Sequence, residues 1–532
     1  MAPCSFTPHA PSLSCWFMLG FLMYPFMAKK NFLYPADWVK QEPYPTVNST
    51  DIYYTGIANR VYDILKETKC DTSFTSIDQL RVVTMCIAGY FEDVISQNGI
   101  WQNFTSACLK EYGSRLPFFD LDENYYPDEI NKEDIQFLLW HNLQVARRTE
   151  RVIYPHNPVL KLTAEFIYEM LEDEYETAPE NDRLHDFIYR ETEADEACGH
   201  YMAVATWFHY DSFFNIENIN SFLTLKNNFL EQPHNDPEQV KVVVWGMYTT
   251  MVLKNRRSFL ALTTPEWLAR LANGHKQLAA WKDVKVKKAS CYMVEQADAD
   301  KVVLKDLIDN SVVEIAPQHL ETDMKSVEAG KTTIICEFVK FAGNYYRIGT
   351  IAVNEMSEGV EQYVANEKAN RDTSNQKAAY KAFVKANDGR YVQFFKDNDA
   401  CEHFLADKVG YTFSQGVTLP QFKSHKGLML MASPKSGITL QPGVLDCVKA
   451  DDNPFYNPET ASRNALNVIA RANAIPYDVM CRLQDDGMWP DTNYTISDNA
   501  EEGKQLAQKN LRFITDYYYC CNRKADCPTV KA

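Results

Sequence analysis

The stretch that decides the fold class is residues 302–353, which contains VVLKDL (302–307), NSVVEIA (310–316), TTIICEFVKF (332–341) and NYYRIGTIAV (344–353). Each run is rich in β-branched and aromatic residues, and turn-forming residues such as Asn310 and Gly343 separate the runs. Four short strands this close together predict a small meander or barrel. The basic, interrupted segment KDVKVKKASCYMVEQ (282–296) precedes them and is interpreted as a domain boundary.

Helical patterns surround this β-rich stretch on both sides. Before it, apolar residues recur every three to four positions, which predicts helices at residues 51–65, 76–95, 131–145, 158–175, 191–208 and 239–253. Asp51 is the N-cap candidate of the first. After it we expect a helix at 358–386, a strand at 389–395 and further helices from about residue 441.

The predicted fold class is therefore α+β. It comprises a large N-terminal all-helical domain (28–281), a small β-rich, barrel-like module (282–440) and a helical C-terminal region (441–532) that packs back on one of them.

Charge and cysteine usage limit the class of protein. The net charge of −17 argues against broad contact with nucleic acid and against docking on an anionic membrane, because both depend on Lys and Arg. The 14 cysteines show no C-x-x-C spacing, which favours reduced thiols in a cytoplasmic protein. Cys520, Cys521 and Cys527 cluster, and a metal held with a distant fourth ligand is the alternative to free thiols.

The first 27 residues stand apart from the rest. Residues 13–27 (LSCWFMLGFLMYPFM) form an uncharged apolar run, but no basic segment precedes it. The run is also shorter than the roughly 20 residues that a membrane span needs, and it contains Pro25. We interpret residues 1–27 as a non-native or unstructured extension, with Met27 as the natural start, and expect no membrane segment.

The densest candidate site is residues 191–211 (ETEADEACGHYMAVATWFHYD). On a helix, Glu193, Glu196 and His200 would share one face, where carboxylate and imidazole groups are suited to general acid–base catalysis. Glu196 and His200, with His185 nearby, are also candidate metal ligands. The alternative is a solvated acidic helix face with one histidine at the edge of the core.

Other carboxylates support weaker hypotheses. Glu92 and Asp93 end an apolar helix, where such groups either bind backbone amides or an arginine or carry out acid–base chemistry. Residues 165–182 (EFIYEMLEDEYETAPEND) predict an amphipathic helix with an acidic outer face, with a cation site as the alternative. The string Cys401-Glu402-His403 resembles a catalytic set, but sequence neighbours point in different directions.

A further alternative concerns the β-rich module, in which Phe341, Tyr345 and Tyr346 follow the basic run KDVKVKK. Aromatic residues in a basic groove stack the bases of single strands, although the same residues fit a barrel core equally well.

Several strings together resemble a known family. DWVKQEPY, STDIYYTGIANRVYDIL, GYFEDVISQNGIWQNF, YGSRLPFFD and YYPDEINKEDIQFLLW are similar to the N-terminal half of a family from Bacteroidales-type bacteria, classified as a domain of unknown function. VVLKDLIDNSVVEI and GKTTIICEFVKFAGNYYRIGT resemble a small β module, and NPFYN, MWPDT and GKQLAQKNLRFI also fit. The resemblance extends from Ala28 to about Asp516 and implies no catalytic residues. Some relatives of the β module carry a cysteine-rich zinc tail, and CCNRKADC departs from that spacing.

Phosphate-loop, dinucleotide, hydrolase and zinc-protease signatures do not occur in the sequence. The leading hypothesis is therefore an interaction or scaffold protein of the bacterial cytosol, with a possible protein partner. The alternatives are a metal-dependent hydrolase that uses Glu193, Glu196 and His200, and a weak single-stranded nucleic-acid binder. The sequence identifies no cofactor, and whether the protein is an enzyme stays open.

Overall fold

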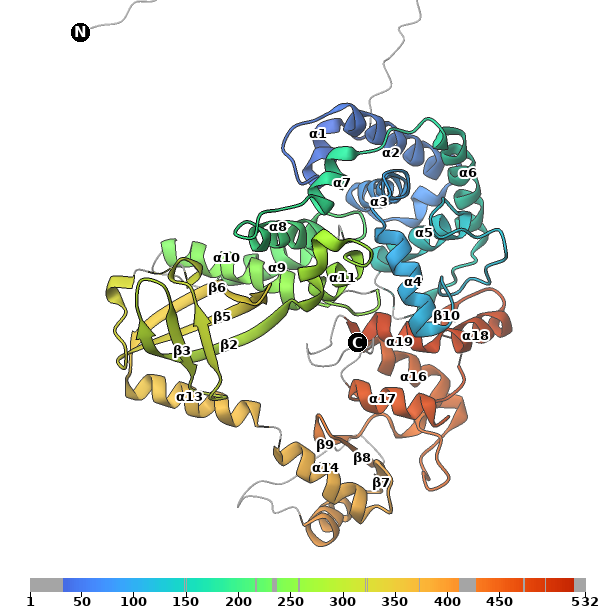
Figure 1. The fold of residues 1–532 in the computed structure, drawn as a ribbon. Helices are drawn as coiled ribbons and strands as arrows, with labels where there is room; N and C mark the ends of the chain where they lie inside the picture. Colours follow the sequence, from blue (N-terminus) through green and yellow to red (C-terminus); the bar gives the residue numbers. More distant parts are fainter. Residues whose placement is uncertain are drawn as a thin grey trace, which may run out of the picture. The chain divides into compact units, whose positions relative to one another are not determined.

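Helices form most of the chain up to residue 271 (Figure 1). The computed structural model describes residues 32–147, 149, 151–215, 218–231, 237–256, 259–320, 322, 324–372, 374–410, 427–471, 474–492 and 494–520. The N-terminal elements are α1 (Pro35–Trp38), η1 (Val39–Gln41), α2 (Ser49–Glu67), η2 (Cys70–Ser73), α3 (Ile77–Ile95), α4 (Ile100–Tyr112), α5 (Lys132–Arg147), β1 (Val152–Ile153), α6 (Pro158–Tyr175), α7 (Asp182–Tyr189), α8 (Ala197–Tyr210), α9 (Asn218–Leu230), α10 (Pro237–Lys254), α11 (Thr264–Leu271) and η3 (Lys276–Asp283).

The predicted helices are present, with shifted ends. In α2 the N-cap is Asn48, so the prediction of Asp51 is wrong. The Asn48 side chain accepts a hydrogen bond from the Asp51 amide (2.9 Å), and the Asp51 carboxylate accepts one from the Asn48 amide (2.7 Å). This reciprocal pair satisfies two amides that the first helical turn leaves free.

The β-rich region begins with a five-stranded antiparallel sheet of order β4-β3-β2-β5-β6. Its strands are β2 (Lys285–Ala297), β3 (Val302–Asp306), β4 (Val312–Ile315), β5 (Thr332–Phe341) and β6 (Asn344–Glu355), with α12 (Pro317–Leu320) and η4 (Met324–Ser326) between β4 and β5. One face buries a core that includes Tyr292, Leu304, Ile334 and Phe338. In the described part of the chain, β4 and β6 form the two edges of this sheet and do not pair with each other. The sheet is therefore open, and the predicted barrel is wrong.

The basic segment interpreted as a boundary is part of the central strand β2, which pairs with both β3 and β5. The register against β5 shifts between Lys287 and Ser290, which interrupts the alternation of apolar and polar residues. Lys287 lies close to the carboxylates of Asp306 (3.0 Å) and Asp309 (2.8 Å), so its charge is paired within the sheet. Most of this segment is thus the first strand of the β-rich region, and a domain boundary at its start stays a prediction.

Helix α10 approaches β6 closely at two glycines. A Cβ atom on Gly246 would lie 2.5 Å from Cγ2 of Thr350, which is nearer than two carbon atoms approach. Gly349 has a positive φ of 65°, a conformation that favours glycine. Gly246 thus allows the backbone of α10 to lie directly against the sheet.

The predicted helix at 358–386 is two helices, α13 (Glu358–Arg371) and α14 (Ser374–Ala386). They lead to a three-stranded antiparallel sheet of order β7-β8-β9, formed by β7 (Val392–Phe395), β8 (Leu428–Ser433) and β9 (Gly437–Gln441), with α15 (Asn398–His403) and the π-helix η5 (Phe404–Val409) before β8. Leu428 and Leu430 pack with Phe383 of α14 in a separate small core.

The C-terminal helical region is η6 (Leu445–Cys447), α16 (Pro458–Arg471), α17 (Tyr477–Asp485), β10 (Thr495–Ile496), α18 (Ala500–Lys509) and α19 (Leu511–Cys520). It contacts the three-stranded sheet, where the Tyr391 hydroxyl donates a hydrogen bond to Asp486 (2.8 Å). It also packs on the N-terminal helices: β10 pairs with β1 in parallel, and the Tyr112 hydroxyl of α4 donates to the buried Asp516 of α19 (2.9 Å). The predicted packing of this region against an earlier one is thus present.

Candidate functional site

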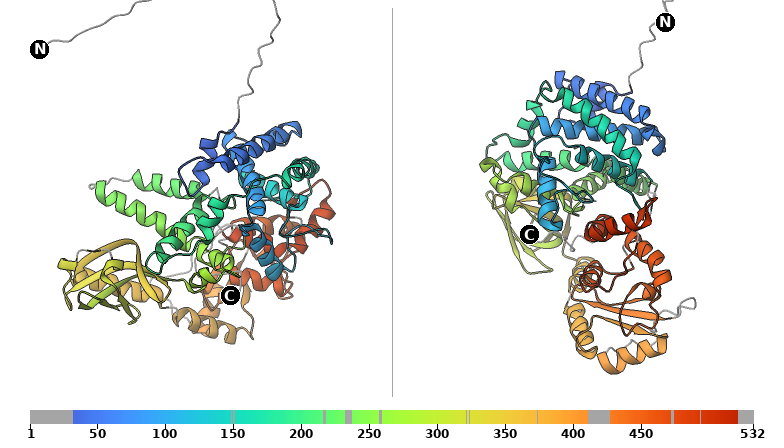
Figure 2. Two further views of the ribbon diagram at one scale, coloured as in Figure 1. Left: turned by 45° about the horizontal axis from the view of Figure 1, so that its top comes forward. Right: turned by 90° about the vertical axis from the view of Figure 1, so that its right-hand side faces the viewer.

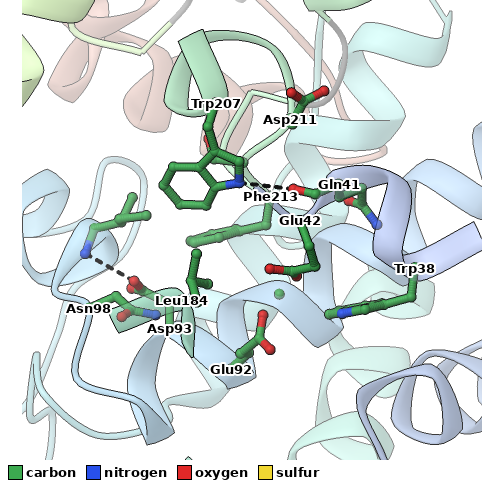
Figure 3. Close-up of a pocket in the computed structure, with 13 residues that line it drawn as sticks. Trp38, Gln41, Glu42, Glu92, Asp93, Asn98, Leu184, Trp207, Asp211 and Phe213 are labelled. Atoms are coloured by element: carbon green, nitrogen blue, oxygen red, sulfur yellow. Dashed lines mark hydrogen bonds between the residues drawn. The ribbon is translucent and has the colours of Figure 1, made fainter. Parts of the chain in front are cut away.

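A small cavity lined by carboxyl groups lies among the N-terminal helices (Figure 3). Gln41 and Glu42 follow α1, Glu92 and Asp93 lie at the end of α3, and Trp207 and Asp211 come from the end of α8. Apolar walls are supplied by Trp38, Leu184 and Phe213. The cavity brings together segments that are far apart in the sequence. The Trp207 indole donates a hydrogen bond to the Gln41 carbonyl (2.8 Å), and these two residues are 166 positions apart.

Asp93 has a structural role beside this cavity. Its carboxylate accepts hydrogen bonds from the backbone amides of Ile100 (3.1 Å) and Trp101 (2.9 Å), which are the first residues of α4. These amides have no partner within their own helix. The alternative that a carboxylate at the end of α3 satisfies backbone amides is thus confirmed for Asp93.

Glu92 belongs to a buried hydrogen-bond network. The Asn181 side chain donates to Glu92 (2.9 Å) and to the Tyr44 hydroxyl (2.8 Å). The Tyr44 hydroxyl in turn donates to Asp51 (3.1 Å). The guanidinium of Arg183 lies over the Tyr44 ring, 3.8 Å from the ring centroid, and places a positive charge next to this network. The network fixes the side chains of α2, α3 and α7 relative to one another.

Burial dominates the titration of these acids. It raises the pKa of Asp93 to about 7 and the pKa of Asp211 to about 6. Burial raises the pKa of Glu92 to about 8, opposed by the Asn181 hydrogen bond and assisted by the negative charges of Asp51 and Asp93. Burial and the charge of Glu92 raise the pKa of Glu42. The two glutamates cannot both ionise without mutual repulsion, so the protonated form is favoured near neutral pH.

The size of the cavity decides what it can hold. Its volume of about 20 Å³ is enough for one water molecule and too small for an organic substrate. Four lining atoms are buried and have no hydrogen bond of normal geometry within the described residues: Nε1 of Trp38, Nε2 of Gln41, Oε2 of Glu42 and Oδ1 of Asn98. Asn98 and Trp38 lie at opposite ends of the cavity (Figure 3), so these four atoms do not converge on one point. The small volume leaves the cavity no room for a substrate.

The sequence-predicted residues Glu193, Glu196 and His200 do not share a helix face. Helix α8 begins at Ala197, while Glu193 and Glu196 lie in a turn closed by the Glu196 amide and the Glu193 carbonyl (3.1 Å). Both glutamates are exposed and His200 is buried. The shared helical face was a wrong prediction. A physical reason is that residues 191–196 carry four carboxylates, which repel each other at helical spacings.

The two candidate histidines, His200 and His185, contact neighbouring side chains. His200 accepts a hydrogen bond at Nδ1 from Nε of Arg190 (3.3 Å), and burial together with this cation lowers the pKa of His200. His185 packs on the ring of Tyr189 at 4.9 Å, and His275 stacks on the same tyrosine at 4.2 Å. Over the described ranges, no group of three or more His, Cys, Asp or Glu has metal-binding geometry. The catalytic and metal-binding roles of Glu193, Glu196, His200 and His185 stay predictions.

Other candidates are placed as follows. Cys521 and Cys527 lie outside the described residues. Cys401 is buried, whereas the Nδ1 of His403 lies 2.7 Å from the Asp399 carbonyl. In the β-rich module Phe341 is buried against Tyr201, and Tyr346 packs on His319 at 4.1 Å. Tyr345 packs partly buried against the sheet core. These aromatic residues contribute to packing, which is the role that the sequence left open beside base stacking.

The predicted acidic helix is α6, and its outer face is the best candidate binding surface. Five positions at spacings of three and four residues run along it: Val159, Leu162, Phe166, Glu169 and Asp173, which we call the α6 outer face. The three apolar side chains are between 36% and 48% exposed, and the two acids are exposed as well. The buried side of α6 packs through Leu160, Ala164, Ile167 and Leu171. The acidic character of this face was predicted from the sequence. The exposure of its apolar residues was not predicted, because apolar residues at helical spacing normally belong to the core.

More negative charge surrounds this face. Tyr168 and Tyr175 have pKa values raised by burial and by nearby carboxylates that include Glu129, Glu133 and Glu172. Two acids of α6 are paired, Glu174 with Arg60 and Glu165 with Lys132. The last turn of α6 contains no basic residue, although cations are favoured there because the helix dipole is negative at that end.

The fold and its surfaces define a large mixed α+β protein with an exposed acidic helical face and, in its described part, no recognised catalytic centre. The chain belongs to the family of proteins of unknown function DUF3843, whose model matches residues 32–324 and 346–520. The predicted membership in a family of unknown function is thereby confirmed, whereas its bacterial origin stays a prediction. Comparison with curated proteins and with solved structures finds no match. None of the described helices is long and apolar enough to cross a membrane.

Proposed function

We propose that the protein is an interaction or scaffold protein of the bacterial cytosol that binds a basic amphipathic helix of a partner protein on the α6 outer face. The observation that carries this proposal is the pattern of that face, in which exposed apolar residues are followed along the same stripe by carboxylates. Exposed apolar side chains and clustered carboxylates are both unfavourable on a free surface. A partner helix with apolar and basic residues would cover the apolar side chains and neutralise the carboxylates.

The apolar half sets the form of the partner. Val159, Leu162 and Phe166 occupy the a, d and a positions of a heptad, the spacing at which one helix packs along another. Covering the exposed part of a leucine or phenylalanine contributes about 1 kcal/mol each, since full burial contributes about 1.5–3 kcal/mol. Three such contacts are modest, so the apolar half alone gives weak binding.

The acidic half sets the charge of the partner. Glu169 and Asp173 continue the heptad stripe, and Glu172 and Glu176 are exposed beside them. These acids lie toward the negative end of the helix dipole, where a carboxylate costs about 0.3–1 kcal/mol. Lys or Arg side chains of a partner would remove this repulsion. The partner is therefore a helix with apolar residues in one half of its seam and basic residues in the other.

Location in the cytosol is supported by the thiols. Cys108 and Cys336 are buried free thiols, and burial raises their pKa values, which makes these thiols unreactive. A reducing compartment is where such thiols persist.

The test uses a fluorescein-labelled synthetic helix of leucine and lysine with that seam, and a matched helix with glutamate in place of lysine. Fluorescence anisotropy with the full chain should show binding of the lysine peptide that weakens as salt increases. Leu162→Gln should weaken binding about fivefold, the equivalent of about 1 kcal/mol. Glu169→Gln with Asp173→Asn should weaken it and reduce its salt dependence.

The control variants separate this face from the general negative charge of the chain. Glu358→Gln with Glu361→Gln removes two exposed acids from the first turn of α13, and Val312→Gln removes an exposed valine from β4. Both should bind the lysine peptide as the wild type does. Equal binding of the two peptides, or equal losses in the α6 and control variants, would refute the proposal.

A further inference from the structure

Helix α9 has an unusual distribution of apolar residues for an exposed helix. Its sequence NINSFLTLKNNFL contains a single charged residue, Lys226. Leu223, Leu225 and Leu230 are each between 40% and 44% exposed. Because Leu225 and Leu223 point to nearly opposite sides of the helix, apolar surface flanks the contact strip on both sides. A helix that is apolar around much of its circumference is normally covered.

The contact that holds α9 is narrow. Phe222 is buried against Tyr248 of α10, with ring centroids 5.0 Å apart, and against Tyr210 of α8 at 5.9 Å. Tyr210 and Tyr248 stack at 4.3 Å, and Trp245 stacks on the outer side of Tyr248 at 5.8 Å. Trp245 is 62% exposed, the highest fraction among the large apolar side chains described. An aromatic stack therefore leads from the core to a tryptophan in solvent.

Leu225 and Trp245 lie on the same part of the surface. Helices α9 and α10 lie side by side (Figures 1 and 2), and the six residues 231–236 connect them, so the two helices run in opposite directions. Leu225 lies one turn after Phe222 in α9, and Trp245 lies one turn before Tyr248 in α10. Because the two helices run in opposite directions, both residues are displaced from the Phe222–Tyr248 contact in the same direction. We call this part of the two helices, with Leu225 and Trp245 at its centre, the α9–α10 surface.

Charge indicates what covers this surface. Residues 218–254 contain three lysines (226, 241 and 254) and three acids (231, 236 and 238), so their net charge is zero in a chain of −17. Two copies of a strongly acidic chain repel each other over most of their surfaces. A neutral, apolar helical pair is where that repulsion is weakest, and where a basic partner has nothing to bind.

We propose that the α9–α10 surface binds a second copy of this chain and forms a symmetric dimer. Each α9–α10 pair packs on its counterpart, and Trp245 and Leu225 supply the central contacts, as buried tryptophans commonly do at interfaces. This inference goes beyond the proposed function and does not depend on it, because the α6 outer face takes no part. A dimer would present two α6 outer faces.

The test is the mass of the full chain by light scattering and sedimentation from about 1 to 100 µM. The wild type should change from the chain mass of 61.2 kDa toward twice that value as concentration rises. Trp245→Gln with Leu225→Gln should weaken dimerisation at least tenfold. Leu162→Gln, which changes an equally exposed leucine of the α6 outer face, should dimerise as the wild type does.

Trp245 also provides a direct readout. The acrylamide quenching of Trp245, taken as the difference between the wild type and Trp245→Phe, should fall as the dimer forms. Circular dichroism checks that the variants are folded, which is expected because the substituted side chains are exposed. A wild type that stays monomeric up to 100 µM would overturn the proposal. A dimer that the Trp245/Leu225 variant leaves intact would overturn it too.

Discussion

Replacing Phe513 with alanine should destabilise the N-terminal and C-terminal helices together. Phe513 of α19 is 1% exposed and lies among rings of two distant parts of the chain. Its ring meets Tyr112 of α4 at 5.5 Å and Phe118 at 5.4 Å, both nearly perpendicular, and Phe137 and Trp140 of α5 at 6.1 and 6.4 Å.

The size of the effect follows from these contacts. Burying a phenylalanine contributes about 2–3 kcal/mol. The two edge-to-face pairs add about 0.5–1.5 kcal/mol each, which gives a total of about 3–6 kcal/mol. Rigid aromatic neighbours on α4, on α5 and in the segment between them cannot easily collapse into the space, so the upper part of this range is expected.

Urea unfolding followed by circular dichroism and by limited proteolysis measures this change. Phe513→Ala should shift the unfolding of α4–α5 and of α16–α19 to lower urea by the same amount. Phe166→Ala, at an exposed phenylalanine of α6, serves as the control and should cost less than about 1 kcal/mol. A loss below about 1 kcal/mol for Phe513→Ala, or one confined to the C-terminal helices, would refute the reasoning.

Two further predictions concern the cavity and the glycines. Because the pKa of Glu92 is raised to about 8, its contribution to stability is fully present below about pH 4.5 and is lost as the pH rises through 8. Glu92→Gln removes this loss, so the melting temperature of the variant relative to that of the wild type should rise from about pH 5 to pH 8 and level off above pH 8; a difference that stays constant from pH 5 to pH 8 would contradict the raised pKa. Gly246→Ala should cost about 1–3 kcal/mol because its Cβ meets Thr350. Gly56→Ala in α2, where a Cβ meets nothing within 4 Å, should stabilise by up to about 1 kcal/mol in the same melting assay.

The sequence predicted those elements whose signal is local. Helices α2, α3, α5 and α6 show regular apolar spacing, and β3 to β6 show β-branched runs between turns. Strand β2 was missed because Lys285, Lys287 and Lys288 give it the composition of a linker, and because the register shift breaks its alternation. The barrel was wrong for a different reason: whether a sheet closes depends on pairing between β4 and β6, which no local pattern contains.

The candidate sites also differ in whether a local sequence pattern indicates them. The acidity of α6 is a helical pattern and was predicted. The cavity depends on Glu42, Glu92 and Trp207 meeting across three distant segments, and only tertiary packing brings them together. Glu193 and His200 do not share a helix face because α8 begins only at Ala197, after four neighbouring carboxylates whose mutual repulsion disfavours a helix that runs through all of them.

The position of α19 also has a consequence for synthesis on the ribosome. His141 of α5 lies 3.1 Å from the Tyr517 hydroxyl, its partner 376 residues later in the chain. At about 5–20 residues per second, translation needs roughly 20–75 s to reach that residue after α5 has emerged. During this time Trp140 and Phe137 lack the aromatic helix that covers them. The nascent N-terminal half is therefore an expected substrate of ribosome-associated chaperones until α19 arrives.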